Sequence, residues 1–176
     1  GSSARGARAR APHLSLVVTG YFDAAPRTPH AGDAEPVRAL VWAALGVTPY
    51  VDRVIELLEA AERGDPDSRA LVVERDGTVA ALALYGPVVG TANTWRLTAT
   101  LVAAQWEPAE LGRALIAAVV ARTRSEGGRM LGAELADDVA LGRSLALLLA
   151  NGFGEEGRVR DFFRVGIALL FLRRDL

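Results

Sequence analysis

Cysteine and lysine are both absent from the 176-residue sequence. Without cysteine there can be no disulfide, no thiolate metal site and no cysteine nucleophile. Without lysine there can be no Schiff base and no lysine general base, and all 20 basic residues are arginines. Only two histidines are present, His13 and His30. Neither has a neighbour at the spacing of metal ligands, so we expect no metal site.

Long apolar runs and an excess of one charge are also missing. No run reaches the roughly 20 apolar residues that a membrane-spanning helix needs, and no signal peptide is evident. The net charge of −1 gives no long-range attraction to nucleic acid or to a membrane surface. We therefore expect a cytoplasmic protein that has no nucleic-acid and no membrane partner. Residues 1–12 are expected to form a flexible arm, and residues 13–176 a single domain.

The sequence is 51% hydrophobic, and its apolar residues recur at strand and helix periods. An Asp-Gly turn signals a hairpin, and Thr48 is expected to cap the second helix, with Pro49 at its first position. The predicted strands are 14–21, 70–75, 79–85, 94–102, 130–135, 156–163 and 167–173. The predicted helices are 34–45, 49–63, 111–124 and 141–150.

The middle of the chain runs strand, helix, strand, which requires a right-handed crossover between parallel strands. The hairpins on either side can pair antiparallel. The fold class is therefore α/β with an α+β mixed sheet: a central twisted sheet of about seven strands, flanked on both faces by about four helices.

The stretch from Asn93 to Arg124 organises this fold. A strand over 94–102 is followed by a short polar turn and then by a helix. Such a turn faces the free backbone N–H groups and the positive end of the helix dipole. An anion, usually a phosphate, is the natural ligand of this arrangement.

Three features of the sequence resemble one known family. They are the order of the elements, the segment Leu-Gly-Arg-Ala-Leu at 111–115 and the segment Ala-Asn-Gly-Phe at 150–153. Together they resemble the GNAT superfamily of acyl-CoA-dependent N-acyltransferases, and the tail Arg-Val-Arg-Asp-Phe-Phe-Arg-Val-Gly at 158–166 is similar to a small bacterial group within it. The resemblance implies a GNAT-like fold, acetyl-CoA or another acyl-CoA as cosubstrate, no metal, and a small amine as acceptor.

The resemblance also implies where the cosubstrate lies. Its pantetheine arm would occupy a V-shaped gap between strand 94–102 and strand 130–135, and its pyrophosphate would lie on the turn 107–112. The residues that this places at the cosubstrate are Val102, Ala104, Glu107, Glu110, Leu111, Gly112, Arg113, Ala114 and Asn151.

The turn departs from the family pattern, which is Gln or Arg, two residues, Gly, one residue, then Gly or Ala. Glu107 and Glu110 stand at its first two defined places, and Pro108 lacks an N–H group. Two carboxylates facing a pyrophosphate would repel it, although Arg113 would offset part of this repulsion. Two readings stay open: coenzyme A binding is weakened or lost, or the site binds it in an altered way.

The catalytic residues implied by the resemblance are mostly replaced. Leu148 stands where the family commonly has a tyrosine acid, and Arg96 where related chains often have an acidic residue. Glu134 remains as the candidate general base; its alternative role is a carboxylate paired with an arginine at the mouth of the cleft. The function predicted is N-acyl transfer to a small amine, and the alternative is a catalytically silent GNAT-fold protein that acts as a binding module or subunit.

Two surface features also have two readings each. Asp137 and Asp138 either bind a cationic substrate or cap the helix that follows. The apolar run 167–172 lacks alternation and must be covered on both faces, either by helices of the same chain or by a partner. The resemblance implies a homodimer through these C-terminal strands.

Overall fold

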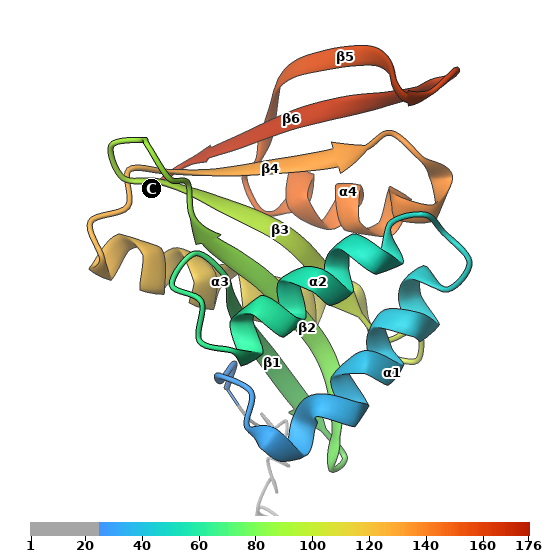
Figure 1. Ribbon diagram of the computed structural model, residues 1–176, viewed down its shortest axis with the longest axis vertical. Coiled ribbons are helices and arrows are strands. Elements are labelled where there is room, and N and C mark those ends of the chain that lie inside the picture. Colours follow the sequence, from blue (N-terminus) through green and yellow to red (C-terminus); the bar gives the residue numbers. More distant parts are fainter. Residues whose placement is uncertain (1–24) are drawn as a thin grey trace, which may run out of the picture.

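The computed structural model describes residues 25–176, in which six strands form one mixed sheet with helices on both faces (Figure 1). The predicted arm 1–12 and strand 14–21 lie outside the described residues. In chain order the elements are η1 (Ala31–Asp33), α1 (Ala34–Leu45), α2 (Val51–Glu62), β1 (Arg69–Arg75), β2 (Thr78–Pro87), β3 (Thr94–Val102), α3 (Pro108–Ser125), β4 (Met130–Ala136), η2 (Val139–Leu141), α4 (Gly142–Ala150), β5 (Gly154–Arg164) and β6 (Ile167–Asp175).

The strand order in the sheet is β1-β2-β3-β4-β6-β5. Among the described strands only β3 and β4 pair in parallel, and α3 connects them. This confirms the predicted mixed sheet with a parallel pair in its middle. The described part of the chain contains six strands rather than about seven, and the strand predicted at 14–21 is the one that it does not cover.

Two apolar cores cover the two faces of the sheet. On one face, α3 buries Leu115, Ile116 and Val119 completely, and α4 packs beside it. On the opposite face, α1 buries Val41 and α2 buries Leu58. Burial of these side chains drives the two helical layers onto the sheet. No described helix is long and apolar enough to cross a membrane.

Most local signals in the sequence act as predicted. Asp76 and Gly77 both have positive φ, 49° and 73°, as a tight hairpin turn between β1 and β2 requires. Gly46 ends α1 at φ 40°, the usual role of a C-terminal glycine.

Two predicted helix starts are wrong. The second helix begins at Val51 rather than at Pro49, because residues 46–50 form turns. The third begins at Pro108 rather than at Leu111, since proline suits the first helical position and Glu107 caps it.

The C-terminal hairpin has one covered strand and one edge strand. On β6, Leu169, Leu170 and Leu172 are buried within this chain, so the helices and sheet neighbours account for most of the apolar run. On β5, at the sheet edge, Phe162 is exposed, and so is Val165 in the turn that follows. A homodimer through these strands stays a prediction.

Arg27 ties the start of the described chain to the sheet. Its backbone pairs with Val72 of β1, and its guanidinium donates to both carboxylate oxygens of Asp33 at 2.6 and 3.0 Å and to Glu74 at 3.0 Å. The Asp33 side chain is only 7% exposed. Hydrogen bonds from Arg27, together with the His30 backbone N–H, lower the pKa of Asp33 from 3.8 to about 2.

We predict that Asp33→Asn lowers the free energy of unfolding by about 2 kcal/mol at pH 7, because a pKa lowered on folding stabilises the charged form of the native state. This stabilisation is present above about pH 4 and is lost as the pH falls through about 2. The difference between variant and wild type in urea unfolding should therefore shrink over that range. Asp67→Asn, in an exposed loop, is the control. A difference that did not change between pH 5 and pH 2 would contradict this assignment.

Candidate functional site

β3 and β4 part after only four paired positions. Thr94 to Leu97 of β3 pair with Met130 to Ala133 of β4. The register of β3 against β2 then shifts, because Leu84 faces Ala99 whereas Tyr85 faces Leu97. Thr98 is therefore an extra residue in β3, and such a bulge bends its strand. Beyond it β3 follows β2, β4 follows β6, and the two strands diverge.

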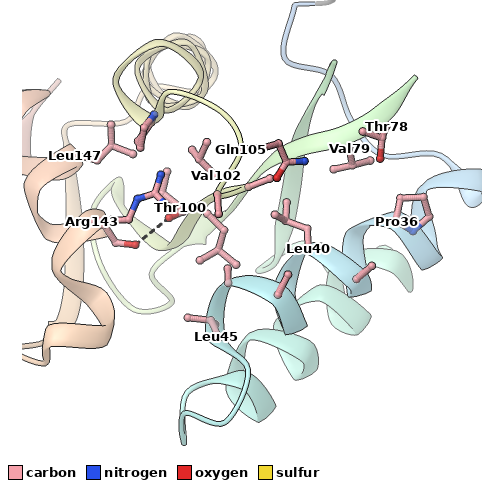
Figure 2. Close-up of a pocket in the computed structure, with 18 of the residues that line it drawn as sticks. Pro36, Leu40, Leu45, Thr78, Val79, Thr100, Val102, Gln105, Arg143 and Leu147 are labelled. Atoms are coloured by element: carbon pink, nitrogen blue, oxygen red, sulfur yellow. Dashed lines mark hydrogen bonds between the residues drawn. The ribbon is translucent and has the colours of Figure 1, made fainter. Parts of the chain in front are cut away.

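The inner edge of β3 beyond the bulge faces α4 instead of β4. The Ser144 hydroxyl of α4 donates to the Thr100 carbonyl at 3.1 Å, drawn as a dashed line in Figure 2. The Thr100 hydroxyl is buried and has no hydrogen-bond partner among the described residues. A buried hydroxyl without a partner is unusual and marks this edge as a place where a ligand can bind.

Three connected cavities follow the gap. The first, the α1–α4 cavity, has a volume of about 450 Å³ and lies between α1, the end of β3 and α4 (Figure 2). The second, the α3–α4 groove, has about 510 Å³ and shares Pro108, Arg143 and Leu147 with the first. The third, the splay cavity, has about 440 Å³ between the diverging strands, α2 and β5, and shares Thr100 and Ser144 with the first. Together they form one cleft from the start of α3 to β5.

The structure brings most of the predicted site residues to this cleft. Val102 and Ala104 line the α1–α4 cavity, and Glu134 lines the splay cavity. The α3–α4 groove is lined by Glu107, Arg113 and Asn151, among others. Of the remaining four, Leu111 and Gly112 are buried, whereas Glu110 and Ala114 are exposed and line none of the three cavities.

The two acidic residues at the start of α3 face different ways. The Glu107 carboxylate accepts from the Ala109 N–H at 3.3 Å, so it caps the helix and lies in the groove. Its carbonyl oxygen accepts from the next two amides, those of Glu110 and Leu111, at 3.3 and 3.4 Å. The Glu110 carboxylate instead pairs with Arg75 at the end of β1. The first amides of α3 are therefore engaged within the helix, and among the residues that the structure describes only Glu107 places negative charge in the groove.

Two arginines line the groove together with Glu107. Arg113 comes from α3 and Arg143 from α4, and the Arg143 side chain reaches from α4 into the adjoining α1–α4 cavity (Figure 2). Neither guanidinium has an ion-pair partner among the described residues. Arginine is well suited to bind phosphate oxygens through paired N–H groups. The groove can therefore hold an anion through side chains where the helix amides are engaged.

Glu134 makes an ion pair at the vertex of the splay. Its carboxylate lies 3.2 Å from Arg96 of β3, and the two side chains are 41% and 44% exposed. Pairing with an arginine at the cleft mouth is the alternative role that the sequence left open for this residue. The pair lies beside the last paired residues of the two strands, so it is placed where they begin to part.

A partly buried network of hydrogen bonds closes the splay cavity near β5. The Tyr50 hydroxyl donates to Asp138 at 2.8 Å, and Arg164 of β5 pairs with the same carboxylate at 2.9 Å. Burial, followed by the hydrogen bond to Asp138, raises the pKa of Tyr50. The pKa of Asp138 is lowered, first by the backbone N–H of Ala140 and then by Tyr50. Asp138 caps η2, which is the second of the two roles that the sequence allowed.

The sequence analysis missed two residues of the cleft, Arg143 and Tyr50. The tripeptide Leu-Gly-Arg occurs at 111–113 and again at 141–143, and this repetition at two helices could have drawn attention to Arg143. Tyr50 gave no comparable signal, because its role depends on Asp138, which is 88 residues away. Among the described residues no cluster of His, Asp and Glu could hold a metal ion.

The fold is shared with solved acetyltransferase structures. A protein from Desulfovibrio desulfuricans assigned to the acetyltransferases of the GNAT family is 29% identical, with a TM-score of 0.77 over 86% of this chain and 98% of that one. The ribosomal-protein-alanine N-acetyltransferase of Brucella melitensis is 25% identical, with a TM-score of 0.68 over 86% and 99%. The chain has the GNAT fold and is similar to these acetyltransferases.

Other comparisons add one ligand-bound relative. The Salmonella typhimurium protein yncA, whose structure contains its cofactor acetyl-CoA, is 20% identical, with a TM-score of 0.66 over 86% of this chain and 92% of that one. No family profile and no curated protein matches the sequence. The likeness of this chain to the GNAT superfamily therefore rests mainly on its three-dimensional structure.

Gly112 is needed for packing at the start of the cleft. A Cβ at this position would lie 2.3 Å from one Leu147 methyl group and 2.6 Å from the other. Leu147 is buried and lines both the groove and the α1–α4 cavity. Gly112 therefore lets α3 and α4 approach closely, and this sets the width of the cleft between them.

We predict that Gly112→Ala lowers the free energy of unfolding by about 1 kcal/mol or more, although alanine is the better helix former, because overpacking forces Leu147 to move. Gly142→Ala in α4 is the matched control, since a Cβ there meets nothing within 4 Å, and it should be neutral or stabilising. Chemical denaturation of both variants gives the comparison. If the two variants were equally stable, Leu147 would be able to move aside without any loss in the free energy of unfolding.

Proposed function

We propose that the protein is an N-acyltransferase of the GNAT superfamily that moves an acetyl or other acyl group from acyl-CoA to a small amine. The observation that carries this proposal is the parting of β3 and β4, which opens one cleft from the start of α3 to β5. The acetyl-CoA bound to the Salmonella typhimurium relative supports the class of acyl donor.

The residues along the cleft fit an acyl-CoA molecule. Among the described residues, the amides of Ala104 and Gln105 make no hydrogen bond, and both residues line the α1–α4 cavity with Thr100. These groups can pair with the amides of a pantetheine arm. Arg113 and Arg143 can hold the phosphates in the groove. Glu107 opposes them, since its carboxylate lies in the same groove.

The reaction needs one proton to leave the amine. As the amine nitrogen bonds to the acyl carbon, the carbon–sulfur bond breaks, the nitrogen loses a proton and the thiolate takes one up. We assign the first transfer to Glu134, the one carboxylate that lines the splay cavity within residues 25–176. Leu148, also in this cavity, cannot donate a proton. Because a thiol has a pKa of about 8.5, the thiolate can leave and take its proton from water.

Binding of acetyl-CoA tests the proposal directly. We expect calorimetry or native mass spectrometry to give a dissociation constant below roughly 100 μM, equivalent to about −5.5 kcal/mol. Release of free thiol in the presence of a panel of amines would then test turnover. Absence of binding at millimolar acetyl-CoA would overturn the proposal.

We predict that Glu107→Gln strengthens acetyl-CoA binding by about threefold to tenfold, close to 1 kcal/mol, because it removes negative charge beside the phosphate arginines and keeps an oxygen to cap Ala109. Glu110→Gln is the matched control. Its affinity should stay within about twofold of wild type, since Glu110 pairs with Arg75 outside the groove. Equal effects of the two substitutions would contradict the different placements of these carboxylates.

We predict that Glu134→Gln lowers kcat by about 10²-fold or more, since general-base catalysis contributes on this scale, and leaves the affinity for acetyl-CoA unchanged. Glu134→Asp should recover part of the activity. Single-turnover kinetics separates the chemical step from binding. A variant with full kcat would show that another group, or solvent, accepts the proton.

A catalytically silent GNAT-fold protein is the second candidate. Three observations favour it: Leu148 replaces an acid, Arg96 already pairs with Glu134, and Glu107 places a carboxylate in the groove. Such a protein would bind acetyl-CoA weakly or not at all, and no amine would raise thiol release above the rate without protein. Binding without turnover across a broad amine panel would favour this candidate over the enzyme.

A further inference from the structure

The charges that line the splay cavity are unequal. Three arginines line it, Arg53 from α2, Arg96 from β3 and Arg164 from β5, against the single carboxylate of Glu134. Asp138 lies behind the wall, and its oxygens are already bonded to Tyr50, Arg164 and the Ala140 N–H. Each of these arginines is paired: Arg53 with Glu56, Arg164 with Asp138, and Arg96 with Glu134. Of the three partners, Glu134 is the one that itself lines the cavity among the described residues, so Arg96 is the arginine whose pairing a ligand in the cavity can change.

The remaining wall of the splay cavity is apolar. Phe162 and Phe163 of β5 lie edge to face with ring centroids 5.1 Å apart, and Phe163 also packs against Tyr50. Leucines from β4, α4 and β6 complete the wall: Leu135, Leu148 and Leu169. A cavity of about 440 Å³ with such walls suits an apolar body of modest size.

The Arg96–Glu134 pair links acceptor binding to the base. Both partners line the cavity and are about two-fifths exposed, and ion pairs at this exposure contribute little to stability. The carboxylate of an incoming ligand can therefore replace Glu134 as the ion-pair partner of Arg96 at a small cost in free energy. Glu134 would then have its oxygens free beside the same ligand, at the vertex where the strands part.

We propose that the acceptor is an amine that also carries a carboxylate on a small apolar body, such as a hydrophobic amino acid, and that its carboxylate binds Arg96 and thereby releases Glu134 to accept the amine proton. This assignment of substrate class rests on the proposed acyltransferase function. It makes Arg96 a specificity-determining residue. Glu134 is then free to act as a base only when the correct acceptor is bound.

The test compares acids with their amides as acceptors. L-phenylalanine and L-leucine have the required carboxylate, whereas L-phenylalaninamide and L-leucinamide have the same body and amine without it. The amine of each amide loses its proton more readily, so a preference for the acid cannot arise from amine reactivity. With wild-type protein and acetyl-CoA we expect kcat/KM to be at least tenfold higher for at least one acid than for its amide.

Variants at Arg96 show whether this residue binds the carboxylate of the acceptor. Arg96→Gln should abolish the preference by lowering kcat/KM for the acid tenfold or more, while the amide is used as well as before or better. Arg96→Lys, which keeps the charge, should retain part of the preference. Arg124→Gln, on the exposed end of α3 and outside the cleft, is the charge-matched control, and circular dichroism confirms folding of each variant.

A separate binding experiment distinguishes failure of this inference from failure of the proposed function. Calorimetry with 3-phenylpropionate, which has the body and the carboxylate but no amine, needs no turnover, and Arg96→Gln should weaken its binding tenfold or more. Acetyl-CoA binding with a preference for amides would overturn the inference and leave the acyltransferase intact. Absence of 3-phenylpropionate and amino-acid binding at millimolar concentration would also overturn it. Loss of acetyl-CoA binding alone would count against the proposed function only.

Discussion

The site depends on the short pairing between β3 and β4. Four residue pairs hold the strands together, and one extra residue at Thr98 then directs β3 along β2 while β4 continues along β6. Each strand keeps its outer partner, so the sheet stays continuous while two inner edges lose their hydrogen bonds to each other. Unpaired backbone in a protein interior is costly, and here Ser144 of α4 bonds the Thr100 carbonyl. The gap is thus a feature that the fold stabilises from both sides.

The start of α3 shows how one region can serve two purposes that conflict. A helix needs its first amides bonded, and Glu107 does this through its side chain and its carbonyl oxygen. An anion site needs the same amides free. In this chain the first amides of α3 are hydrogen-bonded within the helix. Two arginines, one from α3 and one from α4, supply positive charge in the groove instead. In the proposed site, recognition of an anion would therefore rest on side chains rather than on backbone dipoles, and side chains are longer and can adapt to the ligand.

The sequence predicts the elements well and the directions of side chains poorly. Asp76-Gly77, Gly46 and the apolar period of 111–124 have local causes, and the structure confirms the turn, the helix end and the helix that they predict. Spacing in the sequence placed Glu107 and Glu110 together at the turn. The direction of the Glu110 side chain depends on Arg75 of β1, because Glu110 forms an ion pair with this arginine outside the groove. The same holds for Tyr50, whose partner Asp138 comes from a distant loop.

The chemistry of the leaving group decides which replacement in the site matters most. A thiolate departs readily because its conjugate thiol is fairly acidic, so an acid at the position of Leu148 would assist a step that is already easy. The amine nitrogen, by contrast, carries an extra proton once it bonds to the acyl carbon, and a base must remove that proton for the amide to form. Glu134 is the one residue lining the splay cavity that can do so, and Arg96 holds it. In the proposed reaction, activity therefore depends less on the missing tyrosine than on what separates Glu134 from Arg96. The proposed acceptor would provide that separation, because its own carboxylate would bind Arg96 when the base is needed.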